Sequence, residues 1–183
     1  GQNELSFLKR MYANGISNYI DRLKALKFEN FNKVLDVGCG FGQWSIALSL
    51  LNKEVNSIDQ SEKRIKILNE IISCCDLNNI RTNIIPVEKI PYKSKSFDAL
   101  FCYSVLYFID YKKALIEFHR VMKKGARIYI CSNGLGWYLY NLLNPHNKTN
   151  DFDPRMMAMD SISNTLNHYE GNEVGTSADA EED

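Results

Sequence analysis

One stretch of the chain decides the fold: Lys33-Val34-Leu35-Asp36-Val37-Gly38-Cys39-Gly40-Phe41-Gly42. Its first half is apolar and rich in β-branched residues, which favours a strand covered on both faces. Three glycines then remove side chains where the backbone must bend sharply and approach another group closely. A helix is expected from Gln43 to Leu51, and its first N–H groups would face a polar ligand at the turn.

Two classes of ligand use such a turn, and the residues around it favour one of them. Dinucleotide enzymes require G-x-G-x-x-G, but Gln43 stands where the third glycine should be. Asp36 lies just before the first glycine, where its carboxylate would repel a pyrophosphate and favour a cationic ligand. The turn therefore predicts a nucleotide-like cofactor without phosphate.

A second carboxylate follows the next predicted strand, Glu54–Asp59. Asp59 lies about twenty residues after Gly38, the spacing expected between a nucleotide-binding turn and an acid that accepts hydrogen bonds from ribose. The alternative is that Asp59 caps the following helix. Ser61 can provide that cap alone, so ribose binding is the favoured interpretation.

The remaining periodicity predicts alternating helices and strands. Helices are expected at 3–28 with a break at Gly15, 62–75, 110–124 with Gly125 as C-terminal cap, and 136–143, and strands at 81–86, 96–103 and 127–132. This alternation is typical of a Rossmann-like, doubly wound α/β fold, with a mainly parallel sheet and helices on both faces.

The sequence from Val34 to Gly42 closely resembles the cofactor-binding motif of class I S-adenosylmethionine-dependent methyltransferases. The run from Pro91 to Asp98, Pro-Tyr-x-x-x-Ser-Phe-Asp, and the segment from Ala114 to Gly125 resemble two further motifs of that family. Together the three cover roughly residues 30–135, and their joint order is more specific than any one of them.

The resemblance implies the cofactor S-adenosylmethionine, the product S-adenosylhomocysteine, and a set of binding residues. The expected contacts are Asp36, Gly38, Cys39 and Gly40 at the turn, Asp59 and Gln60 at the ribose, Glu88 and Lys89 at the adenine, and Tyr103 and Ser104 at the methionine end. The competing interpretation of Glu88 is a solvated loop acid. No metal site is expected.

No catalytic base is assigned from the sequence. Tyr107 is a candidate, because many relatives carry His at its place, but a phenol with an ordinary pKa is a poor base. Glu117, His119 and Arg120 are expected to be surface or ion-pair residues at the end of the sheet away from the cofactor.

The expected organisation is an N-terminal helical cap at 1–30, a cofactor-binding core at 31–145, a helical extension at 146–170 and a disordered acidic tail at 171–183. Tyr12 and Tyr19 of the cap either cover the cofactor or pack on the sheet. The hairpin that usually follows the fifth strand in the family is not evident, so either the C-terminal edge strands are missing or the chain is a fragment.

Composition narrows the function. The five cysteines lie mostly in apolar runs and form no C-x-x-C pair, which favours reduced thiols in a cytoplasmic protein. No apolar run is long enough for a membrane span.

The charged residues are unevenly distributed along the chain. Residues 151–183 hold nine acids and one basic residue, Arg155, so the balancing positive excess lies in residues 1–150. Those basic residues are scattered, which favours solvated helix faces over nucleic-acid binding.

The expected activity is methyl transfer to O or N of a small-molecule acceptor. The residues after the fourth strand, from Tyr103 to Leu106, lack the Asn/Asp-Pro-Pro-Tyr/Phe loop typical of nucleic-acid base amino methylation. The rival is a non-catalytic or truncated S-adenosylmethionine-binding domain of a larger protein. A nicotinamide oxidoreductase is disfavoured by Asp36 and Gln43. The oligomeric state is not predicted.

Overall fold

The computed structural model describes residues 9, 12–13, 15–144, 148 and 153–170. The chain divides into two compact units, Gly1–Ser132 and Asn133–Asp183, and each is described by itself.

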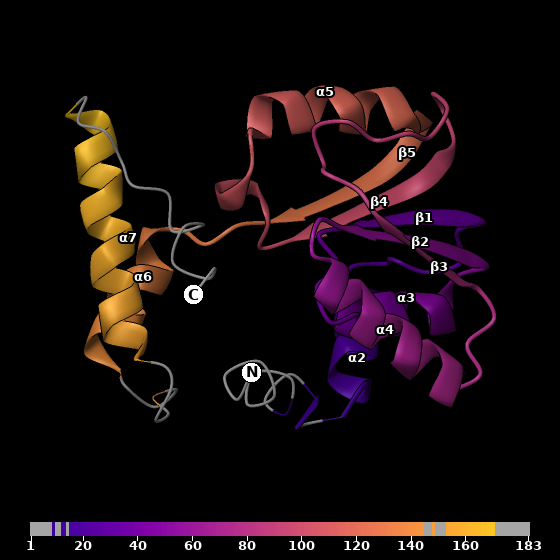
Figure 1. The fold of residues 1–183 in the computed structure, drawn as a ribbon, viewed down its shortest axis with the longest axis horizontal. Helices are drawn as coiled ribbons and strands as arrows, with labels where there is room; N and C mark the ends of the chain where they lie inside the picture. The colour runs from indigo at the N-terminus through magenta and orange to yellow at the C-terminus, as the bar shows by residue number, and fades with distance from the viewer. Residues whose placement is uncertain (1–8, 10–11, 14, 145–147, 149–152, 171–183) are drawn as a thin grey trace. The chain divides into compact units, whose positions relative to one another are not determined.

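A five-stranded parallel sheet forms the centre of the first unit (Figure 1). The strands are β1 (Lys33–Val37), β2 (Glu54–Asp59), β3 (Ile80–Ile84), β4 (Phe97–Tyr103) and β5 (Met122–Cys131), in the order β3-β2-β1-β4-β5. The chain winds outward from β1 to β3 and then returns to the other side of β1. This order places a topological switch point between β1 and β4, where open α/β sheets bind ligands outside the carboxyl ends of the strands.

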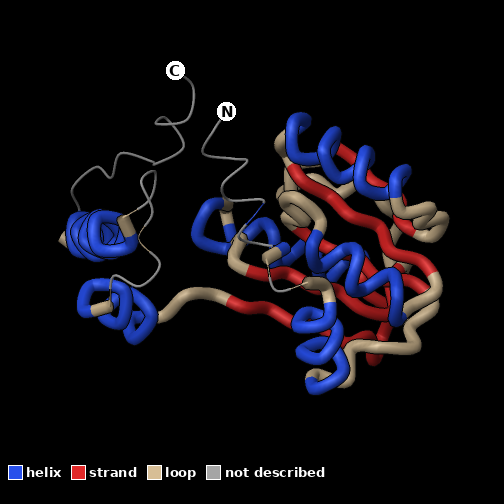
Figure 2. The backbone as a smooth tube through the Cα atoms, turned by 90° about the horizontal axis from the view of Figure 1, so that it is seen from below, coloured by secondary structure: helices blue, strands red, loops and turns tan. Residues whose placement is uncertain are grey.

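Helices cover both faces of the sheet, so the predicted doubly wound fold is confirmed (Figures 1 and 2). The first unit contains α2 (Ser17–Ala25), α3 (Gln43–Leu51), α4 (Glu62–Cys74), the short 3-10 helix η1 (Leu106–Phe108) and α5 (Tyr111–Val121). Figure 1 shows α5 on one face and α2, α3 and α4 on the other.

The core explains why β1 is apolar along its length. Leu35 and Val37 are fully buried with Phe118 of α5 on one face. Val34 is buried on the other face with Trp44 and other residues of α3. Both sides of the strand are covered, as expected for a central parallel strand.

The predicted C-terminal end of the helix at 110–124 is wrong. The helix stops at Val121, and Met122 already belongs to β5, where it pairs with Phe97. The amides of Lys95 and Ser96 donate to the last carbonyls of α5, at Arg120 and Val121. This loop satisfies the helix end that Gly125 was expected to cap, because exposed helix carbonyls need partners wherever the chain can supply them.

Among the described residues of the second unit, α6 (Leu135–Leu143) packs on α7 (Pro154–Tyr169), and the predicted helix at 136–143 is confirmed. Ala158 and Asn141 are buried, whereas Leu135 and Leu143 of α6 are exposed. Within the described residues, no strand follows β5. The expected acidic tail, 171–183, lies outside them.

No helix in the described part of the chain is long and apolar enough to cross a membrane. The same residues contain no group of three or more His, Cys, Asp or Glu side chains that could hold a metal ion.

Candidate functional site

The glycine turn joins β1 to α3 and is built from left-handed backbone. Gly38, Gly40 and Gly42 have φ of 65°, 54° and 85°, a region that only glycine adopts without strain. The Gly42 N–H donates a hydrogen bond of 2.9 Å to the Cys39 carbonyl within the turn, and the Gly38 N–H donates one of 2.8 Å to the Ile58 carbonyl.

The three glycines face different surroundings. A Cβ on Gly38 would lie 2.3 Å from Val105 Cγ2, and one on Gly42 would lie 2.1 Å from Leu68 Cδ1. A Cβ on Gly40 would meet nothing within 4 Å. Two glycines are therefore required by close packing, whereas Gly40 faces open space.

Asp59, at the carboxyl end of β2, is bound to this turn. Its Oδ2 accepts a hydrogen bond of 2.9 Å from the Gly40 N–H, and its Oδ1 accepts one from the Ser61 N–H at 2.9 Å. The Ser61 hydroxyl caps α4 by accepting from the Arg64 N–H, as predicted. Asp59 is 5% exposed, and each carboxylate oxygen retains a lone pair for a ligand hydroxyl. Gln60, the next residue, is exposed.

Asp36 lies beneath the turn in a buried polar network. The Ser45 hydroxyl donates to Asp36 Oδ2 at 2.6 Å, and the Ser57 hydroxyl donates to Ser45 at 2.9 Å. Burial raises the pKa of Asp36 to about 7; the Ser45 hydrogen bond opposes this shift and the nearby Asp59 charge adds to it. Burial also raises the pKa of the Cys39 thiol well above its ordinary value. Cys39 is therefore an inert thiol in the turn.

The loop after β3, residues 85–92, carries the next two predicted contacts. Glu88 is half-buried, and its Oε1 accepts a hydrogen bond of 3.1 Å from the Asp110 N–H at the start of α5. It is therefore engaged with the protein and is not a freely solvated acid. Lys89 is exposed, and its N–H closes a turn on the Pro86 carbonyl.

The end of β4 brings the last predicted residues to the same edge of the sheet. Tyr103 is half-buried, and Ser104 adopts a left-handed φ of 59° while its N–H donates to Cys131. A non-glycine residue in that conformation is uncommon and marks a backbone held by its surroundings. Tyr107 lies in η1, and its side chain is outside the part of the chain that the structure describes.

Residues of the N-terminal segment flank the turn. The Tyr12 hydroxyl donates to the Phe41 carbonyl at 3.0 Å. Tyr19 packs edge-on against Trp44, with ring centroids 4.8 Å apart. The Arg22 guanidinium lies 5.0 Å from the Trp44 ring centroid, over its face. Tyr12 thus contacts the turn itself, whereas Tyr19 packs on the first turn of α3.

Two buried polar atoms near the turn have no hydrogen-bond partner among the described residues: Gln43 Oε1 and Trp44 Nε1. Both belong to the first turn of α3, directly after the glycines. Unpaired buried polar groups are rare in native structures, so the start of α3 has hydrogen-bonding capacity that the described residues do not use.

The structure thus gathers the predicted residues at the carboxyl ends of four neighbouring strands, β3, β2, β1 and β4. Sequence reasoning did not identify Ser45 and Ser57, which complete the Asp36 network. A hydroxyl buried on each of two adjacent elements gives no local pattern. The only available signal was a polar residue inside an apolar segment.

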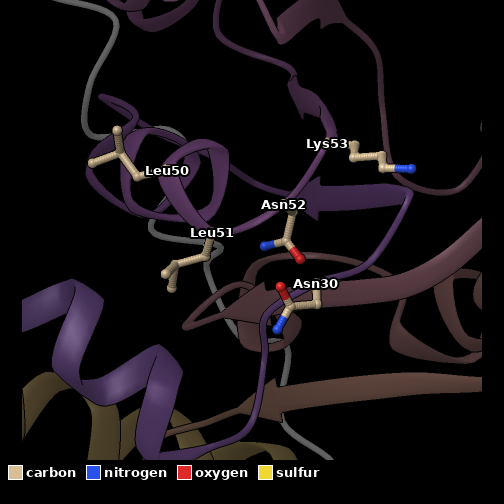
Figure 3. Close-up of a pocket in the computed structure, with 5 residues that line it drawn as sticks. All are labelled: Asn30, Leu50, Leu51, Asn52 and Lys53. Carbon is tan, nitrogen blue, oxygen red and sulfur yellow. The ribbon is translucent and has the colours of Figure 1, made fainter.

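A hollow lies at the amino ends of β1 and β2 (Figure 3). Asn30, Leu50, Leu51, Asn52 and Lys53 line it. The amide of Asn52 is already bonded to the backbone of Phe31, Leu48 and Phe28, so it has a structural role. The hollow therefore offers no amide of Asn52 to a ligand.

Comparisons with known proteins agree on one family. A family model described as a methyltransferase domain matches residues 29–176. An uncharacterised methyltransferase of Bacillus subtilis, YcgJ, is 28% identical over 100 residues, which are 54% of this chain and 40% of that protein. A demethylmenaquinone methyltransferase of Alkalihalophilus pseudofirmus is 29% identical over 112 residues, 59% of this chain and 48% of that protein. The chain thus spans less than half the length of these two relatives.

Among solved structures, a putative S-adenosyl-L-methionine-dependent methyltransferase from Methanococcus maripaludis has the same fold. Its TM-score is 0.62 at 22% identity, and the match covers 93% of this chain and 73% of that one. At this identity the likeness concerns the fold alone.

Proposed function

This chain belongs to the class I S-adenosylmethionine-dependent methyltransferases, and we propose that it binds S-adenosylmethionine at the glycine turn and transfers the methyl group to oxygen or nitrogen of a small-molecule acceptor. The observation that carries the proposal is the arrangement at Gly40. Its backbone is left-handed, the position of a Cβ is open, and its N–H is held by the carboxylate of Asp59.

The residues present are suited to this cofactor. Gly40 leaves room for close approach of a ligand to the backbone, and the spare lone pairs of Asp59 are acceptors for ribose hydroxyls. Oε1 of Glu88 is bonded to the Asp110 N–H, and its Oε2 has no partner within the described residues. That oxygen is the acceptor that we assign to the adenine amino group.

The chain's own contribution to the reaction is placement and electrostatics. Bound S-adenosylmethionine supplies a methyl group on a sulfonium, which needs no further activation. Asp36 is 2% exposed beneath the turn, and in its ionised form it favours a cationic ligand over a phosphate. The residues at the end of β4, Tyr103 and Ser104, are assigned to the methionine end, next to the place where an acceptor must approach.

A small-molecule acceptor is supported by the end of β4, where residues 103–106 lack the sequence typical of nucleic-acid base amino methylation. The name of one relative, demethylmenaquinone methyltransferase, makes a quinone-type molecule the first acceptor to test.

Calorimetric titration with S-adenosylhomocysteine tests the cofactor proposal, with NAD as the competing ligand. Gly40→Ala should abolish binding of S-adenosylhomocysteine, because the new methyl group occupies the open space. Gly125→Ala is the matched control: its φ is 79° and its Cβ position is also open, but it lies in β5. Both variants carry the same kind of backbone strain, so only Gly40→Ala should lose the ligand. NAD binding without S-adenosylhomocysteine binding would support an oxidoreductase instead.

A second candidate function is cofactor binding without catalysis. It is favoured by the described sheet, which has β5 as its edge. Radiolabelled methyl transfer to a panel of quinones, phenols and amines separates the two. Binding of S-adenosylhomocysteine with no transfer to any member of the panel would favour the non-catalytic function.

A further inference from the structure

The loop at residues 85–92 is fastened to α5 at two places. Near its middle, Glu88 accepts the Asp110 N–H at the start of the helix. Near its end, Glu117 and Arg120, from the last two turns of the helix, bind the backbone of Ile90 and Tyr92.

The second contact is a fork of charge-assisted hydrogen bonds. Arg120 Nε and Nη2 each donate to one carboxylate oxygen of Glu117, both at 2.7 Å. The same guanidinium donates to the carbonyls of Ile90 at 2.6 Å and Tyr92 at 2.7 Å. The Ile90 N–H in turn donates to Glu117 Oε2 at 2.9 Å. Planar, bidentate geometry of this kind fixes position as well as adding energy.

Three backbone groups of a segment without regular secondary structure are therefore satisfied by one ion pair. The Ile90 side chain is 3% exposed and packs in the core beside α5. The hydrogen bond from Arg120 lowers the pKa of Glu117, so the carboxylate stays ionised at neutral pH. The pair thus fixes the backbone two residues beyond Glu88.

We infer that Glu117 and Arg120 are positioning residues for the adenine end of the cofactor site: they act through Ile90 and Tyr92 to fix the loop that presents Glu88. The inference rests on the proposed function and deepens it. Neither side chain needs to touch the ligand. Their ion pair is as predicted, and at the C-terminal end of α5 they act on the site through the loop.

A second ion pair provides the matched control. Lys123 Nζ lies 2.7 Å from Asp98 Oδ1, the same distance as the Arg120–Glu117 contact. Asp98 is the second residue of β4, and it also accepts the Lys33 N–H at the start of β1. This pair therefore joins the starts of neighbouring strands and has no hydrogen bond to the loop at residues 85–92.

The test is calorimetric titration of the full chain with S-adenosylhomocysteine and with adenosine, which represents the adenine end alone. Arg120→Ala should weaken both ligands by the same factor, about tenfold, with unchanged stoichiometry. Glu117→Gln keeps an acceptor for the Ile90 N–H and should give a smaller loss. Arg120→Lys should recover little, because an ammonium cannot bridge two carbonyls and a carboxylate in one plane. Lys123→Ala should leave both affinities within twofold.

The outcomes are distinct. If the unmodified chain binds S-adenosylhomocysteine and both Arg120→Ala and Glu117→Gln bind it and adenosine within twofold of normal, the positioning role is overturned. A fall in stoichiometry at unchanged affinity would also overturn it, because it would show a loss of folded protein only. Failure of the unmodified chain to bind S-adenosylhomocysteine would instead overturn the proposed function.

Discussion

The glycine turn and the loop at residues 85–92 both begin at the carboxyl ends of strands, β1 and β3, but are held in different ways. The turn is fixed by its own backbone and by neighbours on adjacent strands, through Gly42–Cys39 and Gly38–Ile58 hydrogen bonds. The loop is fixed by side chains from α5, a helix that begins almost twenty residues later in the chain. The shape of the turn therefore depends on three glycines with left-handed backbone, whereas the loop depends on two long, charged side chains.

The largest expected loss in the free energy of unfolding comes from a substitution in the glycine turn. Gly38→Ala would place a methyl group 2.3 Å from Val105 Cγ2 in a left-handed conformation. Strain at φ > 0 and overpacking against a stiff β-branched side chain should together lower the free energy of unfolding by about 2–5 kcal/mol. Urea unfolding measures this loss. Gly125→Ala is the control for backbone strain alone, and its free energy of unfolding should fall by about 1–2 kcal/mol. Equal losses in the two variants would contradict the packing argument.

The second prediction concerns the carboxylate beneath the turn. Burial raises the pKa of Asp36 to about 7, so the folded protein keeps a proton that the unfolded chain releases above about pH 4. The free energy of unfolding should therefore fall as pH rises from about 4 to 7, by up to roughly 4 kcal/mol from this group.

Asp36→Asn should flatten that slope, because the amide does not titrate and still accepts from Ser45. Urea unfolding of both proteins at several pH values gives the comparison. A slope that is the same in the variant would show that Asp36 is ionised throughout this range.

The contrast between the turn and the loop also explains what the sequence could predict. The strand–turn–helix unit at 33–51 and the Ser61 cap were predicted because their signals are local, in apolar runs, glycines and a capping serine. The residue at which α5 ends was not predicted, because the carbonyls of Arg120 and Val121 accept hydrogen bonds from a loop that lies earlier in the chain. The hydrogen bonds from the Glu117–Arg120 pair to the loop were not predicted either. The i,i+3 pair is visible in the sequence, but its bonds to a loop about 30 residues earlier depend on the fold.

A smaller loss in the free energy of unfolding is expected when the contact between α5 and the loop at residues 85–92 is removed. Arg120→Ala removes two hydrogen bonds to backbone carbonyls and leaves Glu117 without its partner. Because the guanidinium is about one third exposed, we expect a loss of about 1–2 kcal/mol in the free energy of unfolding. Hydrogen exchange should be faster at the Ile90 amide, whose N–H is bonded to Glu117, and unchanged at the Gly42 amide of the turn. Faster exchange at both would show that the two segments are coupled.

The smallest effect is expected at Glu88. Glu88→Ala removes the acceptor of the Asp110 N–H, but Asp110 still caps α5 by accepting from the Lys113 N–H at 3.2 Å. The helix therefore keeps one cap, and the free energy of unfolding should fall by only about 0.5–1 kcal/mol. Glu88→Gln retains a carbonyl oxygen for the same N–H and should be nearly neutral in urea unfolding. If both variants lost affinity for adenosine while unfolding as expected, the role of Glu88 in the loop would be ligand binding; a loss of more than about 2 kcal/mol in Glu88→Ala would instead make it a structural cap of α5.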